Sequence, residues 1–390
     1  MNKSRQPQTW IDEQNALITT PRFLSSTHSR ITVRDEKSVT PLSVFPQINY
    51  KKKRAQSTFS LSHIKHLSDI ENEIFSEAFA VLDRCLDFLD GYENIPFSIK
   101  NFQDFKSRLH SHIDQLESLS SFDPKMNEKL KHIFRGELYS YISNSKIARR
   151  GLQKPFGYPG DYEMLQQLYN DQILSEDNVG KFFDYLALEG PLAKAVILRV
   201  KGMAKRVQDF IDSVNSTEVH ILNIASGPGF DIKPIVEKIQ QKRIYFHCFD
   251  QEVSSLRYVG ERYFGTNPRV HLLLYKEDLK SFFKKWNGQK FDFIYNIGLA
   301  DYLPDRVLKS FMQEAIDSLN VGGKFVLAHK DYLRFPHVYT SWLYDWNFIH
   351  RSLADYHQFI QDNLCRFREY SIFFESPQQI IYFGEFTGAA

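Results

Sequence analysis

One short stretch joins an apolar run to residues that suit a ligand-binding loop. Residues 219–231 read VHILNIASGPGFD, so the run stops at Ala225 and is followed by Gly227, Pro228 and Gly229. Glycine carries no Cβ and adopts positive φ readily, which lets a backbone come close to a ligand. Ordinary turns are also rich in Gly and Pro. The stretch alone therefore predicts either a plain turn or a ligand site.

An acidic residue follows this loop at a distance that is typical of ribose recognition. Asp250 ends the apolar run RIYFHCFD, about twenty residues after the glycines. A carboxylate at the end of a second strand can accept hydrogen bonds from both hydroxyls of a ribose. The alternative is a helix N-cap, because Asp is a preferred cap residue. The combination of loop, spacing and strand end favours ribose binding.

The number of glycines indicates which nucleoside would bind. Dinucleotide-binding loops have the fuller pattern G-x-G-x-x-G, whose backbone approaches a pyrophosphate. This chain reads ASGPG at 225–229 instead. That pattern favours S-adenosyl-L-methionine (SAM), which contains no pyrophosphate. We therefore expect SAM as the cofactor, in contact with Ala225, Gly227, Gly229 and Asp250.

A second segment is predicted to lie at the same edge of the molecule. Residues 291–305 read FDFIYNIGLADYLPD, an apolar run followed by polar residues. Asn296 and Gly298 would face the methionine end of SAM, and Asp301 and Tyr302 would face the acceptor. The segment lacks the [DN]-P-P-[YF] pattern of methyltransferases that act on amino groups of bases. A nucleobase acceptor is therefore not expected.

Two polar residues at the ends of other apolar runs have roles that the sequence leaves open. Asp278, in YKEDLKSF, could accept a hydrogen bond from the adenine amine or cap the next helix. His329 ends the run that follows Gly322-Gly323. The ordinary pKa of histidine suits a general base, but His329 could equally be a satisfied structural residue.

The segment KPFGYPGDYEM at 154–164 is too elaborate for a featureless linker. Two glycines and two prolines surround Tyr158 and Asp161. The segment could fold over the cofactor as a lid that contains Tyr158. Alternatively it is a rigid turn in which Asp161 caps the following helix.

Periodicity indicates the elements that would position these residues. From residue 219 onward, short apolar runs alternate with helical segments, which predicts an α/β fold with a parallel sheet. The expected strands are 219–225, 243–249, 270–275, 291–297, 323–329, 366–374 and 378–384. The expected helices between them are 230–240, 253–264, 304–319 and 341–362. The last two strands are joined by Glu375-Ser376-Pro377 and should pair antiparallel. The result is a doubly wound, seven-stranded Rossmann-like sheet with an antiparallel terminal hairpin.

The part of the chain before the sheet is predicted to be helical. Apolar residues recur at three- and four-residue steps from Leu61 to Leu89, and further helices are expected near 99–119 and 124–147, the last capped by Asp123. We therefore divide the chain into four parts. They are a disordered basic tail (1–57), a helical region (58–150), linker or lid helices (151–218) and a methyltransferase domain (219–390).

Composition limits the classes of protein that fit. The chain has 390 residues, 42% hydrophobic and 25% charged, which is typical of a globular protein. A net charge of +2 does not indicate nucleic-acid binding. Cys85, Cys248 and Cys365 form no C-x-x-C pair, so neither a metal site nor a redox pair is expected. Sparse cysteines and the lack of a long apolar run favour a cytoplasmic protein.

The tail carries the basic excess of the chain. Residues 1–57 contain ten Lys and Arg against four Asp and Glu, a net charge of +6. They show no periodicity, which is typical of disorder. The cluster at 51–54, KKKR, could contact an anionic membrane peripherally or nucleic acid, or could simply be solvated. The sequence does not predict an oligomeric state.

Several of these segments together resemble a family of class I SAM-dependent methyltransferases, the extracellular-factor 3-hydroxypalmitic acid methyl ester biosynthesis proteins. The matching segments, in chain order, are Lys154 to Met164, Ala225 to Gly229, Asp250, Ile294 to Leu303, Val321-Gly322-Gly323, Asp345-Trp346 and Arg351. The resemblance covers about residues 150–384. The chain departs from the family pattern at Ala300 and at Ala328-His329-Lys330, both beside the expected acceptor site.

The resemblance implies methyl-ester formation on a fatty acid or another small carboxylic acid. Candidates for positioning the acceptor or closing the site are Tyr158, Asp301, Tyr302, His329 and Arg351. Two alternatives stay open. One is N- or O-methylation of a small polar metabolite, for which a base such as His329 would be needed. The other is an inactive protein of the same fold that acts by interaction through its helices and basic tail.

Overall fold

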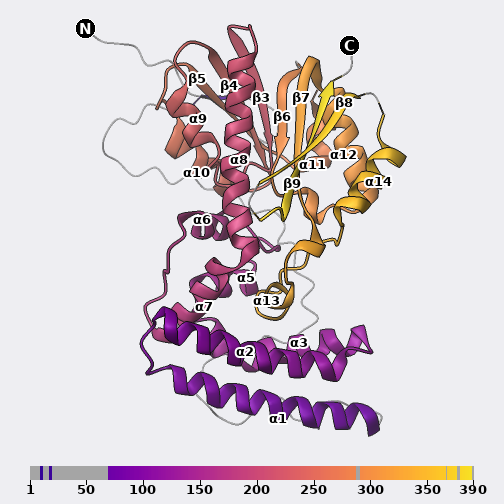
Figure 1. The fold of residues 1–390 in the computed structure, drawn as a ribbon. Coiled ribbons are helices and arrows are strands. Elements are labelled where there is room, and N and C mark those ends of the chain that lie inside the picture. The colour runs from indigo at the N-terminus through magenta and orange to yellow at the C-terminus, as the bar shows by residue number, and fades with distance from the viewer. Residues whose placement is uncertain are drawn as a thin grey trace, which may run out of the picture.

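The computed structural model describes residues 69–286, 290–365, 367–375 and 378–388, together with two short strands nearer the N-terminus. The described chain forms a sheet flanked by helices, below which lies a helical region built from the earlier residues (Figure 1). Helix α8 (Pro191–Ser213) runs along the sheet and leads from the helical region into it. Among the described residues, no helix has the length and apolar character needed to cross a lipid bilayer.

Seven strands form the main sheet, as the sequence predicts. They are β3 (Glu218–Ile224), β4 (Arg243–Asp250), β5 (Val270–Lys276), β6 (Phe291–Asn296), β7 (Leu319–Lys330), β8 (Phe367–Phe374) and β9 (Ile381–Gly388). Their spatial order is β5-β4-β3-β6-β7-β9-β8. Strands β3 to β7 are parallel, and β9 is antiparallel to both β7 and β8. The doubly wound sheet with an antiparallel terminal hairpin is therefore confirmed.

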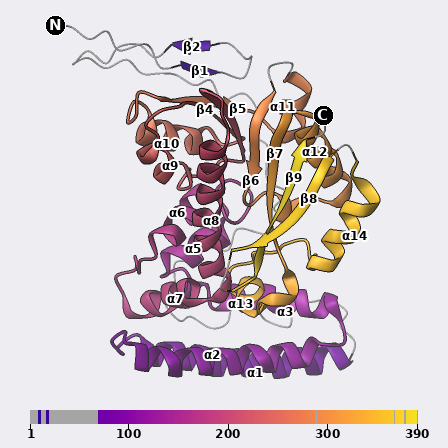
Figure 2. The same cartoon turned by 45° about the horizontal axis from the view of Figure 1, so that its top comes forward.

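Two additional strands extend this sheet at one edge. Strand β1 (Thr9–Ile11) pairs parallel to β5, and β2 (Leu17–Thr19) pairs antiparallel to β1 (Figure 2). Both belong to the segment predicted as a disordered tail, so at these positions the expectation is corrected to strand. The basic cluster at 51–54 lies outside the described residues.

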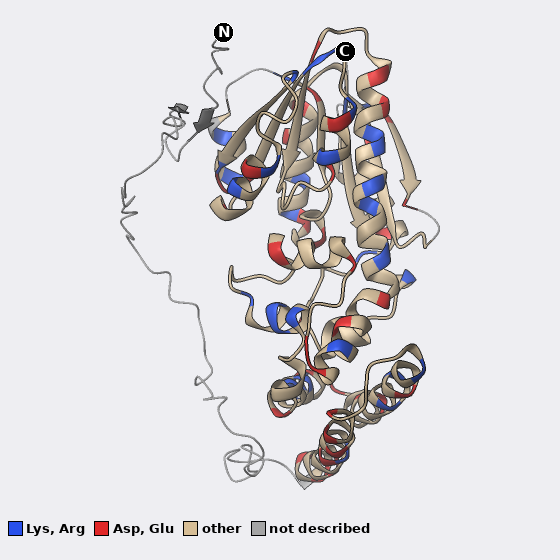
Figure 3. Ribbon diagram, turned by 90° about the vertical axis from the view of Figure 1, so that its left-hand side faces the viewer, with Lys and Arg blue, Asp and Glu red and all other residues tan. Residues whose placement is uncertain are grey.

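Helices cover both faces of the sheet because successive strand residues point to opposite sides. Ile221 packs with α8, α9 (Ile232–Lys238) and α10 (Val253–Tyr263), whereas Leu222 packs with the opposite layer. That layer contains α11 (Leu279–Lys285), α12 (Asp305–Asp317) and α14 (Leu353–Asn363). Figure 3 shows few charged residues on the strands and many on the helices. The sheet is thus a buried middle layer.

Two of the expected helices are corrected by the structure. The helix predicted at 341–362 is two helices, α13 (Val338–Trp342) and α14, and Asp345 in the break has φ +46°. Ser352 starts α14 through a capping box with Asp355. The helix predicted at 124–147 is also divided, and Ser145 caps its last part. Two 3₁₀ turns, Ala300–Tyr302 and Tyr332–Arg334, follow β6 and β7.

The helical region has its own apolar core. Its helices are α1 (Asp69–Tyr92), α2 (Ile99–Ser120), α3 (Pro124–Glu137), α4 (Tyr139–Ile142), α5 (Lys146–Gln153), α6 (Tyr162–Asn170) and α7 (Asn178–Glu189). Asp123 caps α3, as predicted, by accepting a hydrogen bond from Lys125 N. Trp342, at the end of α13, and Trp346, in the break between α13 and α14, are buried in this core. They join the helical region to the sheet domain at the carboxyl ends of the strands.

Candidate active site

The loop after β3 has a backbone shape that a plain turn does not require. Ala225, Gly227 and Gly229 have φ of +52°, +53° and +63°, so three alternate residues are left-handed. For a residue with a Cβ this conformation costs about 1–2 kcal/mol. Ala225 therefore stands where glycine would be less strained, and the loop resembles a glycine-rich loop more closely than its sequence suggests.

The two glycines of this loop have different surroundings. A Cβ on Gly227 would meet only Leu165 Cδ1, at 3.9 Å, so this residue borders open space. A Cβ on Gly229 would lie 3.0 Å from Val259 Cγ2, so this glycine packs tightly against α10 and leaves little room for a side chain. Just before Gly227, Ser226 Oγ is buried and has no hydrogen-bond partner among the described residues. Gly227 and Ser226 are thus the loop positions that could receive a ligand.

Asp250 links the end of β4 to this loop. Its carboxylate accepts hydrogen bonds from Gly227 N (2.9 Å), Glu252 N (2.9 Å) and Ser255 Oγ (3.2 Å). Burial raises the pKa of Asp250, partly offset by these hydrogen bonds. Helix α10 starts at Val253 and has Glu252 at its N-cap, so Asp250 is not the cap. The predicted contact with ribose stays a prediction, and the position of Asp250 beside Gly227 suits it.

The segment 154–164 lies between Asp250 and Trp346. Tyr158 is hydrogen-bonded to Gln251, and burial together with the nearby charge of Asp250 raises the pKa of its hydroxyl. Gly160 has φ +74°, and a Cβ there would lie 2.6 Å from Trp346 Cζ2. The predicted cap is confirmed, because Asp161 accepts hydrogen bonds from Glu163 N and Met164 N of α6. The segment is therefore a rigid turn that also covers this edge.

Ion pairs fix this segment in place. Arg150 Nε donates to Asp161 Oδ1 at 2.7 Å, and Lys154 forms an ion pair with Asp345. Arg135 of α3 also approaches Asp345, at 3.4 Å. Two of the segments that carry the family resemblance, 154–164 and Asp345-Trp346, thus contact each other in the fold.

Asp301 is the centre of a buried charged cluster at the ends of β6 and β7. Its carboxylate lies 2.6 Å from His329 Nδ1, forms an ion pair with Lys330 Nζ, and is 3.9 Å from Arg199 Nη1. Burial alone would raise the pKa of Asp301, but Lys330 and His329 hold it well below its usual value. Burial lowers the pKa of Lys330 to about 8, against the attraction of Asp301. Asp301 thus stays a carboxylate, bound by its own neighbours.

His329 faces the core and not the open edge. Its ring packs against Tyr356 and Tyr382, which are both fully buried between α14 and the sheet. Nδ1 is engaged with Asp301, and Nε2 is buried without a partner among the described residues. This geometry gives His329 a role in holding Asp301 through Nδ1.

Three other predicted residues form hydrogen bonds with backbone atoms of neighbouring segments. Arg351 Nη2 donates to Leu303 O and to Asp305 Oδ1, each at 2.6 Å, which fixes the segment after β6. Asn296 Nδ2 donates to Ile224 O at 2.6 Å, and so ties β6 to β3. Asp278 accepts a hydrogen bond from Ser281 N at 2.9 Å, and thereby caps α11. For Asp278 the helix-cap alternative is the one that the structure shows.

Tyr302 and Gly298 belong to the segment after β6, where Tyr302 contacts Trp346 and Gly298 contacts α8. Tyr302 Oη accepts a hydrogen bond of 2.5 Å from Trp346 Nε1. A Cβ on Gly298 would lie 3.2 Å from Arg199 Nη2, so this glycine makes room for the guanidinium. Sequence analysis missed Arg199, although one arginine within the apolar face of a predicted helix is a usable signal. It also missed Lys330 as a charged partner of Asp301.

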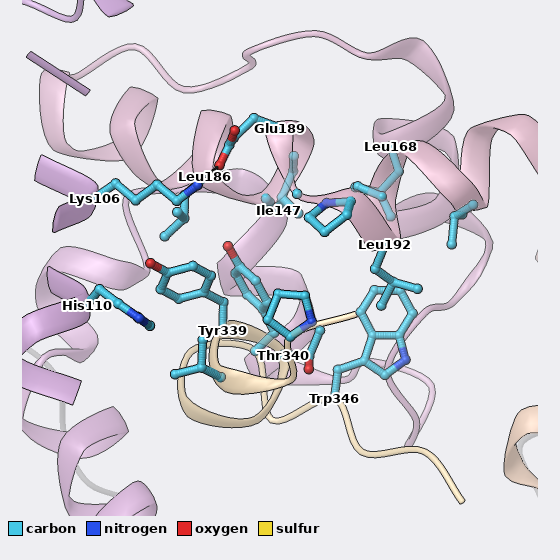
Figure 4. Close-up of a pocket in the computed structure, with 18 of the residues that line it drawn as sticks. Lys106, His110, Ile147, Leu168, Leu186, Glu189, Leu192, Tyr339, Thr340 and Trp346 are labelled. Carbon is cyan, nitrogen blue, oxygen red and sulfur yellow. Dashed lines mark hydrogen bonds and ion pairs between the residues drawn. The ribbon is translucent and has the colours of Figure 1, made fainter. Parts of the chain in front are cut away.

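A mostly apolar cavity of about 430 Å³ lies beside this edge, between the helical region and α8. Figure 4 shows Lys106, His110 and Glu189 at one end and Leu168, Leu192 and Trp346 at the other. The polar end includes exposed residues of α2, whereas the three residues at the apolar end are buried. The cavity thus opens near α2 and ends next to the hydrogen-bonded pair Trp346–Tyr302.

Comparison with one solved structure supports the fold. No family model matches the sequence, and no curated protein matches it either. A solved structure from Bordetella parapertussis, described as a "possible exported protein", has a TM-score of 0.50 at 15% identity and covers 65% of this chain and 87% of its own. The SAM-bound magnesium protoporphyrin IX methyltransferase of Synechocystis PCC 6803 has a TM-score of 0.36 at 11% identity, and the match covers 51% of this chain and 84% of that protein. The N-methyltransferase NodS of Bradyrhizobium japonicum has a TM-score of 0.36 at 12% identity, and the match covers 49% of this chain and 97% of that protein.

Proposed function

We propose that this protein is a SAM-dependent methyltransferase that forms methyl esters of carboxylic acids with an apolar body. The cofactor assignment is supported by the loop after β3. Its features are three left-handed residues, open space at Gly227 and the unpartnered Ser226 Oγ. The loop lies where doubly wound sheets bind nucleotides, at the carboxyl ends of the strands. When bound, SAM supplies an electrophilic methyl group on its sulfonium sulfur.

Each residue of the site has a distinct task in this proposal. The loop 225–229 holds the cofactor, and Asp250 accepts hydrogen bonds from its ribose. Tyr158 and the rest of the segment 154–164 exclude water from the reacting centre, which strengthens electrostatic interactions there. Gly298 and Tyr302 define the side from which the acceptor approaches. The carboxyl ends of β3, β4 and β6 bring these groups together at one edge.

The cavity is the observation that carries the choice of acceptor. Its volume of about 430 Å³ and its buried apolar end suit a hydrocarbon body, and it ends at Trp346 beside Tyr302. A carboxylate oxygen already has the electron pair for the new O–CH3 bond, so no proton has to be removed. This matches a site in which His329 is engaged with Asp301. The protein would act by orientation and by exclusion of water.

The experiment is an acceptor screen with purified protein and SAM, read by mass spectrometry. The acceptors are straight-chain carboxylic acids of increasing length, with the alcohol and the amine of each length as matched compounds. We expect a gain of one methyl group on the acids alone, and no product with an Asp250→Ala variant. Methylation of the amines or alcohols, but not of the acids, would overturn the ester assignment. A protein that does not bind SAM would overturn the enzyme assignment.

A further inference from the structure

Arg199 and Lys330 form a buried cationic pair that one carboxylate does not balance. Arg199, Lys330 and Asp301 expose 4%, 4% and 1% of their surface. Among the described residues, Asp301 is the one carboxylate that forms an ion pair with either cation. Tyr169 is hydrogen-bonded to Arg199, and the ammonium of Lys330 lies 4.1 Å from the centre of the Phe348 ring. Two cations therefore share one anion in a site that is closed to water.

A buried charge without a counterion is costly, so the pair would gain from a second anion. Arg199 is prepared to bind one. Its Nε is buried and has no hydrogen-bond partner among the described residues. A guanidinium presents a planar fork of donors that matches the two oxygens of a carboxylate. Arg199 thus has unused donor capacity of the kind that a carboxylate would satisfy.

The position of Arg199 connects the two halves of the proposed active site. Its Nη2 lies against Gly298, at the end of β6. Val196, one turn earlier on the same face of α8, lines the apolar cavity. Arg199 thus lies one turn of α8 beyond a residue of the cavity wall.

We propose that Arg199, assisted by Lys330, is the seat for the carboxylate of the acceptor and selects acids over their neutral analogues. This inference rests on the proposed function and assigns Arg199 as a positioning residue within it. The methionine part of SAM also carries a carboxylate, so Arg199 could bind that group in place of the carboxylate of the acceptor. The cavity wall one turn away on α8 favours the acceptor, and the experiment separates the two.

The test measures binding by calorimetry, in the presence of S-adenosylhomocysteine, so that it does not depend on turnover. The ligands are a medium-chain carboxylate and its methyl ester, with the wild-type protein, Arg199→Gln and Arg206→Gln. Arg206 is a matched control because it lies two turns further along α8, where it contacts Glu385 and Phe373. We expect the wild type and Arg206→Gln to bind the acid at least tenfold more tightly than the ester. Arg199→Gln should lose this preference and keep its affinity for S-adenosylhomocysteine.

Each other outcome is decisive. Equal affinity of the wild type for acid and ester would refute the proposed carboxylate-binding role of Arg199. This measurement uses the wild-type protein alone, so it does not depend on whether a variant folds. Loss of S-adenosylhomocysteine binding by Arg199→Gln, with the preference for the acid unchanged, would show that Arg199 holds the cofactor carboxylate. Binding of the cofactor product but of no apolar acid or ester would overturn the proposed acceptor, and the seat with it.

Discussion

Two glycines in the segment 154–164 offer a matched pair of substitutions. Gly157 and Gly160 have φ of +84° and +74°, so alanine is strained at both positions. They differ in what a new Cβ would contact. At Gly157 nothing lies within 4 Å, whereas at Gly160 the Cβ would lie 2.6 Å from Trp346 Cζ2 and 3.2 Å from Tyr302 Oη. The pair therefore separates backbone strain from displacement of the site.

The structure gives the size of each effect. Positive φ costs a residue with a Cβ about 1–2 kcal/mol, so Gly157→Ala should lower the free energy of unfolding by about that amount. Gly160→Ala adds an overpacking cost of about 1–3 kcal/mol, because an indole ring cannot yield as a flexible side chain does. It should also move Trp346 from its hydrogen bond with Tyr302. A displacement of about 1 Å at a reacting centre can lower a rate by about 100-fold.

Urea denaturation measures the stability, and SAM-dependent methyl transfer to the best acceptor measures the activity. We expect Gly157→Ala to keep wild-type kcat/KM within about threefold, and Gly160→Ala to lose at least about tenfold. The loss should persist at a temperature where both variants are fully folded. If Gly160→Ala kept wild-type activity, or if both variants lost the same activity, the placement of Trp346 and Tyr302 beside the acceptor would be refuted.

Three further predictions concern single residues. Ala225→Gly should raise the melting temperature or leave it unchanged, because glycine removes the strain of φ +52° at the cost of greater freedom in the unfolded chain, and SAM binding by calorimetry should be retained. Burial raises the pKa of Asp231 to about 6 from 3.8, so the folded state favours the protonated carboxyl. The contribution of Asp231 to the free energy of unfolding is therefore fully present below pH 4 and is lost as the pH rises through 6. Asp231→Asn should thus gain up to about 3 kcal/mol over wild type between pH 4 and pH 7.5 in urea denaturation, and an equal difference at both pH values would contradict this. His329→Asn should keep methyl transfer to acids within about tenfold, since a general base contributes about 100-fold or more and a larger loss would assign His329 that role.

The sequence predicted the sheet well because its signals are local. Each strand is a short apolar run, and every expected strand of the main sheet is present within a few residues. The glycine loop and Asp250 were predictable for the same reason. Asp250 and Gly227 come next to each other only because β3 and β4 pair in parallel, which the strand–helix alternation already implied.

The proposed acceptor side was less predictable because it depends on contacts between distant residues. Lys154 and Asp345 are 191 positions apart, and Trp346 reaches the helical core only because the chain breaks between α13 and α14. That break, with its left-handed Asp345, looks helical in a periodicity analysis since Trp342, Leu343 and Trp346 are all apolar. Arg199 was missed because its role depends on Gly298, which belongs to another element.

The most direct test of the central claim is the fate of a labelled methyl group. SAM with a labelled methyl carbon is incubated with the protein and an apolar carboxylic acid, and the product is then treated with mild alkali. We predict that the label enters the organic product and is afterwards released as methanol, and that Asp250→Ala transfers none. Label that stays on the product after alkali, or that never leaves SAM with any acid, would contradict methyl-ester formation.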